Sequence, residues 1–88
     1  MDKELTSTVR LSDVEEGESC TLVKWGAVPE QEIQRLKNLG VMTGMPVTVS
    51  QATLSGPVVV AVNDAHIAIA GHIAEEILVL KTHSKEAR

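Results

Sequence analysis

The sequence predicts a small, mostly β protein: an antiparallel barrel of about five short strands with one to two short helices, the main helix inserted after the first strand. Three observations support this prediction. The 88 residues suffice for one domain. The chain is 43% hydrophobic but has one Trp and no Phe or Tyr, so its core is built from Val, Ile, Leu, Met and Ala, which suit curved β packing. Gly, Pro and Asn separate several short apolar runs, and residues 31–39 have helical spacing.

The domain is expected to occupy residues 9–81, between a flexible N-terminus at 1–8 and a polar tail at 82–88. Its first feature is a single helical turn at Leu11–Val14. We expect Ser12 to cap this turn and Gly17 to end the segment, since serine and glycine are common at those positions.

The first barrel strand is predicted at Cys20–Trp25, where side chains alternate with the period of a strand. Cys20 and Leu22 then face the core. Trp25 lies at the rim of the barrel, just before Gly26.

A short amphipathic helix follows, with Pro29 as its first residue and Ile33, Leu36 and Leu39 as its apolar positions. Gly40 supplies the left-handed residue that ends a helix, and Val41 is expected to fold back onto Leu36 in a Schellman ending. Leu36, Leu39 and Gly40 therefore serve the framework of the fold.

A tight turn then leads into the next strand. Met42–Met45 fits a type II turn, because Gly44 stands where a positive φ is required. The remaining elements are strands at 47–51, 58–62, 66–70 and 77–80, a bend at Leu54–Pro57, a turn at Asn63–Asp64, and a helical turn at Gly71–Ala74.

The composition excludes several classes of function. A net charge of −4 argues against nucleic-acid binding, which needs clustered Lys and Arg. No apolar run approaches the roughly 20 residues of a membrane span, so no direct membrane insertion is expected. The N-terminus has no secretory h-region and the chain has one cysteine, which favours a cytoplasmic location. The acidic cluster at residues 13–18 is interpreted as a solvated turn.

No catalytic motif or Gly-rich phosphate loop occurs, so we predict neither an enzyme nor a bound cofactor. Cys20, in an alternating strand, is interpreted as a small buried hydrophobe. Metal binding is the alternative, since His66, His72, His83 and several carboxylates are available. Their spacing matches no metal motif, however, and no dedicated iron site is predicted.

Four large apolar residues at strand ends and turns are the candidates for partner binding: Trp25, Met42, Met45 and Leu54. Trp and Met are enriched in protein–protein contacts. The alternative interpretation is that the four seal the ends of the barrel, and both roles are compatible in so small a chain. An aromatic groove for polyproline peptides cannot be built from one Trp.

A series of motifs in a fixed order resembles the FeoA family, small cytosolic proteins associated with ferrous iron uptake. The match runs from about Leu11 to Leu80. The motifs are Leu11-x-x-Val14-x-x-Gly17-Glu18, Arg35-Leu36-x-x-Leu39-Gly40-Val41-x-x-Gly44-x-x-Val47-x-Val49, Gly56-Pro57-Val58-x-Val60, Ile67-Ala68-Ile69 and Ala74-x-x-Ile77-x-Val79. The sequence departs from the family at Thr43, where proline is common, and at Ala70–Gly71, where a basic residue is common.

The resemblance implies an SH3-like β-barrel without catalysis, acting as an accessory to the membrane transporter FeoB. Similar modules end iron-responsive repressors, but their DNA-binding domain has no counterpart in this sequence. The main hypothesis is therefore a cytosolic protein that binds an FeoB-like transporter and modulates it. The alternative is an iron or zinc sensor or carrier that uses surface histidines and carboxylates. The sequence leaves homo-oligomer formation open.

Overall fold

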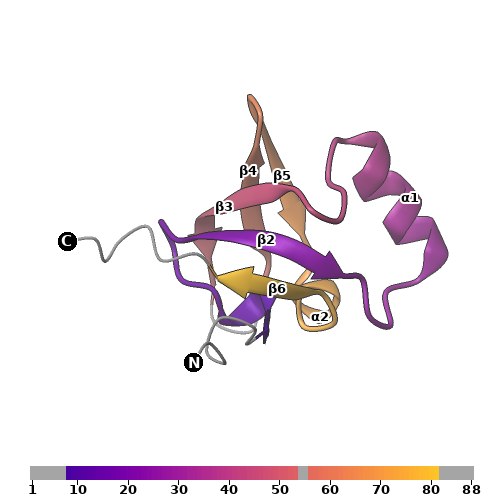
Figure 1. Ribbon diagram of the computed structural model, residues 1–88, viewed down its shortest axis with the longest axis horizontal. Coiled ribbons are helices and arrows are strands. Elements are labelled where there is room, and N and C mark those ends of the chain that lie inside the picture. Colours follow the sequence, from indigo (N-terminus) through magenta and orange to yellow (C-terminus); the bar gives the residue numbers. More distant parts are fainter. Residues whose placement is uncertain (1–7, 54–55, 82–88) are drawn as a thin grey trace.

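A computed structural model describes residues 8–53 and 56–81 of the chain. These residues form six strands, two α-helices and one 3-10 turn (Figure 1). In chain order the elements are β1 (Val9–Arg10), η2 (Leu11–Asp13), β2 (Ser19–Lys24), α1 (Glu30–Asn38), β3 (Pro46–Ala52), β4 (Val58–Val62), β5 (Ala65–Ile69), α2 (Gly71–Ala74) and β6 (Leu78–Lys81).

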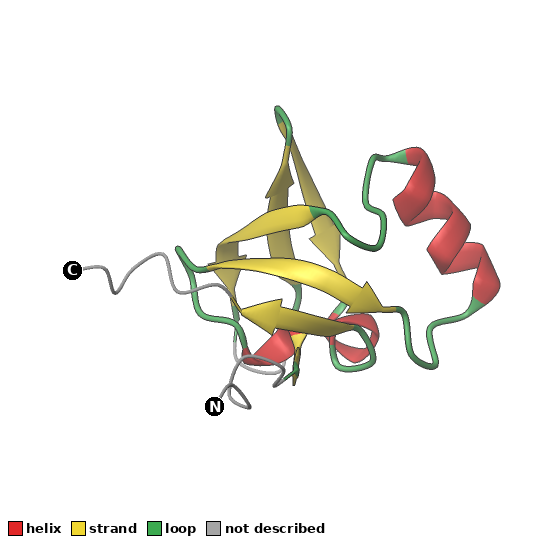
Figure 2. Ribbon diagram, viewed as in Figure 1, coloured by secondary structure: helices red, strands yellow, loops and turns green. Residues whose placement is uncertain are grey.

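All the strands belong to one antiparallel sheet with the order β1-β6-β2-β3-β4-β5. The sheet curls around the core like a barrel, but its end strands β1 and β5 do not pair, so the hydrogen-bonded sheet is not closed (Figure 2). The prediction of a mostly β fold with about five strands in a curled sheet is confirmed. The additional strand is β1, whose two residues pair with Val79 and Leu78. Two residues are too few to show a strand period.

Among the described residues, the core contains only apolar side chains and Cys20, and no polar or charged residue is buried. This confirms the prediction of a core without large aromatics. The β3–β5 meander shows how it forms, since β4 has alternate residues buried and β5 adds two isoleucines at period-2 spacing. The buried residues of this region are Val47, Val49, Val58, Val60, Val62, Ile67 and Ile69.

The N-terminal turn differs from its prediction. It is the 3-10 turn η2, and Arg10 occupies its N-cap position without a side-chain hydrogen bond. Ser12 lies inside the turn and does not cap it. Burial of Leu11 and Val14, each 1% exposed, holds the turn against the core. Because tertiary packing supplies the stability, the local capping preference of serine is not needed here.

Helix α1 begins one residue later than predicted. Pro29 is the N-cap, with extended φ and ψ of −61° and 146°, and Glu30 is the first helical residue. Pro29 still contributes to the start of the helix, because its carbonyl oxygen accepts hydrogen bonds from the N–H groups of Glu32 and Ile33. Val28, just before it, is buried and anchors the loop that leads from β2.

The end of α1 is the predicted Schellman motif. Gly40 has φ +106°, its N–H donates to the Lys37 carbonyl at 3.0 Å, and the Val41 N–H donates to the Leu36 carbonyl at 2.9 Å. Leu36 and Val41 are both buried, as the hydrophobic contact of this motif requires. The chain is thereby reversed directly after the helix and directed toward β3.

The second half of the chain follows its predicted order. Asn63 adopts φ +57° in the tight turn between β4 and β5, and a short α2 separates β5 from β6. Asp64 completes the turn. The loop between α2 and β6 lies directly against the turn after β2. A Cβ placed on Gly26 would overlap the carbonyl oxygen of Glu76, so these two backbones are in close contact.

Candidate partner-binding surface

The turn between α1 and β3 holds two of the predicted partner-binding residues. Met45 donates its N–H to the Met42 carbonyl at 3.2 Å and Gly44 has φ +85°, the geometry predicted for a type II turn. Two further hydrogen bonds tie the turn to β2, from Gly44 N–H to the Leu22 carbonyl at 2.7 Å and from Leu22 N–H to the Met45 carbonyl at 3.2 Å. Met42 is thus held out on a rigid support.

The two methionines differ in exposure. Met42 is 48% exposed, whereas Met45 is partly buried and packs against the core. Met45 therefore contributes to packing against the core, whereas nearly half of the Met42 side chain is accessible. Exposed methionine provides a flexible, polarizable contact surface.

Trp25 is also partly buried against the core. A β-bulge in β2 explains its position, because Leu22 pairs with Val79 and Lys24 with Leu78, leaving Val23 as the additional residue. A bulge places two residues opposite one and so reverses the alternation beyond it. Trp25 thereby turns toward the same side as Cys20 and Leu22, at the rim of the sheet.

Leu54, the fourth predicted residue, lies outside the described residues. The structure adds two exposed apolar residues to the four predicted ones, Val23 at 42% and Leu39 at 45%. Leu39 is the C-cap of α1, three residues before Met42, and Val23 follows the strand residue that bonds to the turn. We call Val23, Leu39 and Met42, with the flanking Trp25 and Met45, the turn surface.

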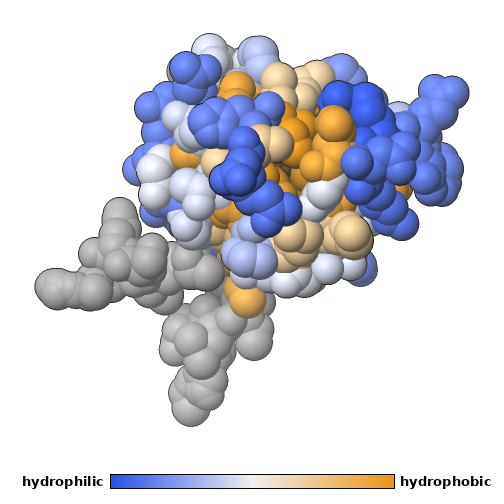
Figure 3. Space-filling model, turned by 90° about the horizontal axis from the view of Figure 1, so that it is seen from above, coloured by the Kyte–Doolittle hydropathy of each residue, from blue (hydrophilic) through white to orange (hydrophobic). Residues whose placement is uncertain are grey.

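Figure 3 shows apolar side chains exposed beside the charged helix α1, the region from which the turn departs. Leu39 differs from its prediction as a framework residue on the apolar face of the helix, because its side chain is 45% exposed. The exposure has a simple cause. At about 100° per residue, position 39 is rotated by about 120° from Ile33, so it leaves the buried face on which Leu36 lies. This signal was available in the sequence, as was the exposure of Val23, since the alternation that directs Leu22 into the core directs its neighbour outward. The bulge that turns Trp25 back has no local sequence signature.

The acidic cluster forms a solvated turn, as predicted, with specific contacts to its neighbours. Asp13, Glu15 and Glu16 are exposed. Glu16 Oε2 accepts a hydrogen bond from the Ala52 N–H at 3.0 Å, and Glu18 lies 3.3 Å from the Lys81 ammonium. These contacts give the carboxylates a structural role between β2, β3 and β6.

Cys20 is fully buried in β2. Burial raises the pKa of its thiol from 9.0 to about 11; the nearby Glu18 carboxylate adds to the increase and Lys81 opposes it. A thiol held protonated in this way is a poor nucleophile. This agrees with its interpretation as a small buried hydrophobe.

The candidate metal ligands do not come together in the described part of the chain. His66 on β5 and His72 on α2 are both exposed, and no group of three or more His, Cys, Asp or Glu side chains could hold an ion there. His83 lies outside the described residues. An open cleft of about 310 Å³ lies beside η2 and α2, and its charged residues are Arg10, Asp13 and Glu75.

The sequence matches a known protein family, and the fold matches solved structures. Residues 9–81 match the FeoA domain family. A crystal structure of an iron uptake regulatory protein, FeoA, has a TM-score of 0.74 and 24% identity, and the alignment covers 86% of this chain and 99% of that chain. The solution structure of the FeoA protein from Chlorobium tepidum has a TM-score of 0.77 and 25% identity, covering 91% and 76%.

A manganese-dependent transcriptional repressor also matches, with a TM-score of 0.75 and 17% identity over 85% of this chain. The chain corresponds to 42% of that repressor, so this likeness concerns the fold of one part. No curated protein sequence matches the chain. Within the described residues, neither helix is long and apolar enough to cross a membrane. The prediction of an SH3-like fold is confirmed.

Proposed function

Because the chain belongs to the FeoA domain family, with residues 9–81 matched, we propose that it is a cytosolic accessory protein of ferrous iron uptake that binds and modulates an FeoB-like transporter. Family membership implies involvement in ferrous iron transport. The contact with the transporter, and its location on the turn surface, are our proposal. We assign the chain a binding role and no catalytic step of its own.

The exposure of Leu39 and Met42 is the observation that supports this location. Among the described residues, only Val23, Leu39 and Met42 are exposed large apolar side chains, and Leu39 and Met42 are nearly half exposed and lie close together in the chain. A central apolar patch of this kind, with Trp and Met at its margin, is typical of protein–protein contacts. Lys24 and Lys37, both exposed, provide a polar rim.

Rigidity of the support also favours a binding role. The Schellman ending of α1 and the type II turn fix the backbone on both sides of Met42, and two hydrogen bonds join the turn to β2. A surface that is already ordered loses little conformational entropy when a partner binds. The turn surface is therefore preorganised for contact.

The test is co-purification of the chain with the cytosolic part and, separately, the membrane part of an FeoB-like transporter. We expect the cytosolic part to bind wild type, and Leu39→Glu and Met42→Glu to lose at least about tenfold in affinity, because each buries a charge in the contact. Trp25→Ala and Leu54→Ala test two further predicted positions. Trp25 is the only tryptophan, so its fluorescence reports whether a partner covers this surface.

Gln51→Glu is the matched control, since it adds the same charge at an exposed position near the other end of β3. It should bind like wild type, and melting curves should show that all the variants are folded. Wild-type affinity for both Leu39→Glu and Met42→Glu would contradict the turn surface as the contact. Absence of binding to both transporter parts would contradict the proposed function itself.

A further inference from the structure

The outer edge of β5 is unpaired. Among the described residues this strand pairs only with β4, through the register Val62↔Ala65, Val60↔Ile67 and Val58↔Ile69. An edge strand presents N–H and C=O groups to which another extended chain can hydrogen-bond.

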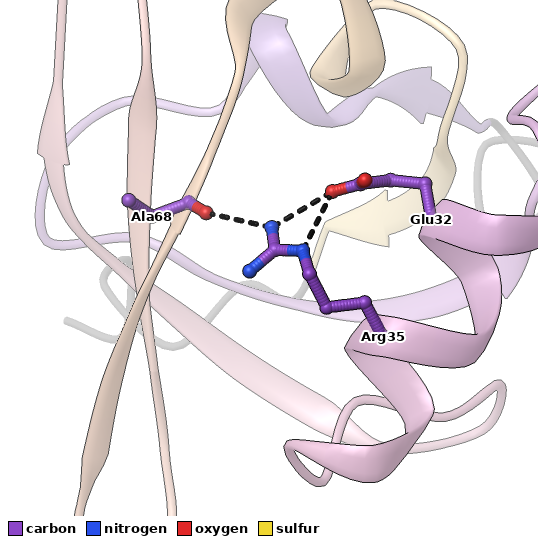
Figure 4. Close-up of polar contacts among 3 residues, drawn as sticks. All are labelled: Glu32, Arg35 and Ala68. Atoms are coloured by element: carbon purple, nitrogen blue, oxygen red, sulfur yellow. Dashed lines mark hydrogen bonds and ion pairs between the residues drawn. The ribbon is translucent and has the colours of Figure 1, made fainter.

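The turn determines which groups point outward. Val62 and Ala65 flank the two-residue turn, so they form a hydrogen-bonded pair, and alternate residues along β5 also face β4. His66 and Ala68 consequently direct their backbone groups away from the sheet. A hydrogen bond from the helix agrees with this assignment, because the outward Ala68 carbonyl accepts from Nη2 of Arg35 on α1 at 3.4 Å (Figure 4).

This edge lacks most of the features that usually protect an edge strand. Its exposed side chains are Ala65, His66 and Ala68, without Pro, Lys or an acid, and its register with β4 has no bulge. The other sheet end, β1, is only two residues long. Protection of β5 therefore depends on α1 and on the single side chain that reaches across to the strand.

That side chain, Arg35, is weakly held. Its Nε and Nη2 both donate to one oxygen of Glu32, at 3.0 and 2.7 Å, in a pair on one face of α1. The Arg35 side chain is 48% exposed, and exposed ion pairs contribute little stability. A carboxylate brought by a partner can replace Glu32, because a guanidinium binds a carboxylate through two parallel hydrogen bonds.

We propose that the β5 edge, beside α1, binds an extended acidic peptide segment of a partner protein. The segment adds to the sheet as a seventh strand by forming backbone hydrogen bonds with His66 and Ala68. A carboxylate of the segment replaces the Glu32 carboxylate as the hydrogen-bonding partner of the Arg35 guanidinium. Main-chain pairing supplies the affinity in this mode of recognition, and the charged contact supplies the selectivity. This binding site is separate from the proposed transporter contact, since it consists of backbone groups of β5 and not of the turn surface.

A second copy of this chain fits the edge less well than a single peptide. In a pairing of β5 with β5, each copy would bring its own α1 to the same edge, as the contact of Arg35 with Ala68 requires, so the two helices would compete for the space. A single extended segment carries no such helix. The charge of Arg35 further favours an acidic segment.

The probe is a displayed library of short random peptides, selected on the wild-type chain and then measured as synthetic peptides in solution. Ala68→Pro removes the outward N–H while keeping the hydrogen bonds with β4, since proline is tolerated where the N–H faces away from the sheet. Ala68→Val is the matched control, because it changes the same exposed position and retains the N–H. Arg35→Gln tests the charged contact.

We expect enriched acidic peptides that bind wild type and Ala68→Val equally, and bind Ala68→Pro and Arg35→Gln about tenfold more weakly. Bound peptide should also slow amide hydrogen exchange at His66 and Ala68 in wild type, a measurement that stands even if Ala68→Pro does not fold. Failure to enrich any peptide, unchanged binding by Ala68→Pro, or unchanged exchange at both amides would overturn the proposal. A dimer that only Ala68→Pro dissociates would assign the edge to a second copy.

Discussion

Replacing Gly26 with alanine is expected to destabilise the protein more than the same replacement at Gly17 or Gly44. All three glycines have positive φ, between +67° and +88°, so alanine brings left-handed strain of about 1–2 kcal/mol at each. A Cβ at Gly17 or Gly44 would meet no heavy atom within 4 Å. At Gly26 it would overlap the Glu76 carbonyl oxygen and lie 3.1 Å from the carbonyl carbon.

The overlap at Gly26 involves backbone, which cannot rotate away as a flexible side chain would. Relief requires a shift of the loop between α2 and β6, and such forced shifts cost about 1–3 kcal/mol more. The expected total is about 2–5 kcal/mol, a large share of the roughly 5–15 kcal/mol that stabilises a domain. The turn after β2 and the loop before β6 would then lose their close contact.

The assay is thermal and urea unfolding of the three alanine variants, followed by circular dichroism. Since about 1 kcal/mol shifts Tm by roughly 4–8 °C in a domain of this size, Gly26→Ala should melt at least about 4 °C below both Gly17→Ala and Gly44→Ala. Equal losses at the three positions would refute the reasoning, because strain alone would then account for the effect at Gly26.

Two further predictions compare buried and exposed positions or follow the titration of the cysteine. In urea unfolding, Leu36→Ala should lose about 2–5 kcal/mol of stability, because Leu36 is fully buried. Leu39→Ala should stay within about 0.5 kcal/mol of wild type, because that side chain is 45% exposed. Equal losses would contradict the exposed position of Leu39. The raised pKa of Cys20 means that the unfolded chain loses its thiol proton first, from about pH 9, so stability should be unaffected below that pH and fall as pH rises toward about 11. The part of this decline due to the thiol should be absent in Cys20→Ala, and identical pH profiles for the two proteins would refute it.

The sequence by itself determined the local features of this protein, because their causes lie within a few residues. Glycine at 40 and 44 specified a left-handed helix end and a type II turn, and both hydrogen-bond patterns were confirmed. Asn63–Asp64 specified a tight turn, a continuous β-branched run specified β4, and alternating isoleucines specified β5. The order of the motifs also identified the family.

Tertiary structure decided the features that depend on residues far apart in the chain. Val9 becomes a strand residue only because it meets Val79. Val23 is the additional residue of a bulge in the pairing of β2 with β6, and this bulge turns Trp25 back onto the core. Local preferences cannot encode such pairings, since the partner strand fixes the register.

The candidate surfaces divide in the same way. The sequence selected Met42 as an apolar residue on a turn, and its exposure agrees with that choice. It also selected Met45 and Trp25, which the fold packs partly inside. The β5 edge and its contact with Arg35 depend on where α1 lies relative to the end of the sheet. That position follows from packing of the whole domain, which is why only the tertiary structure revealed it.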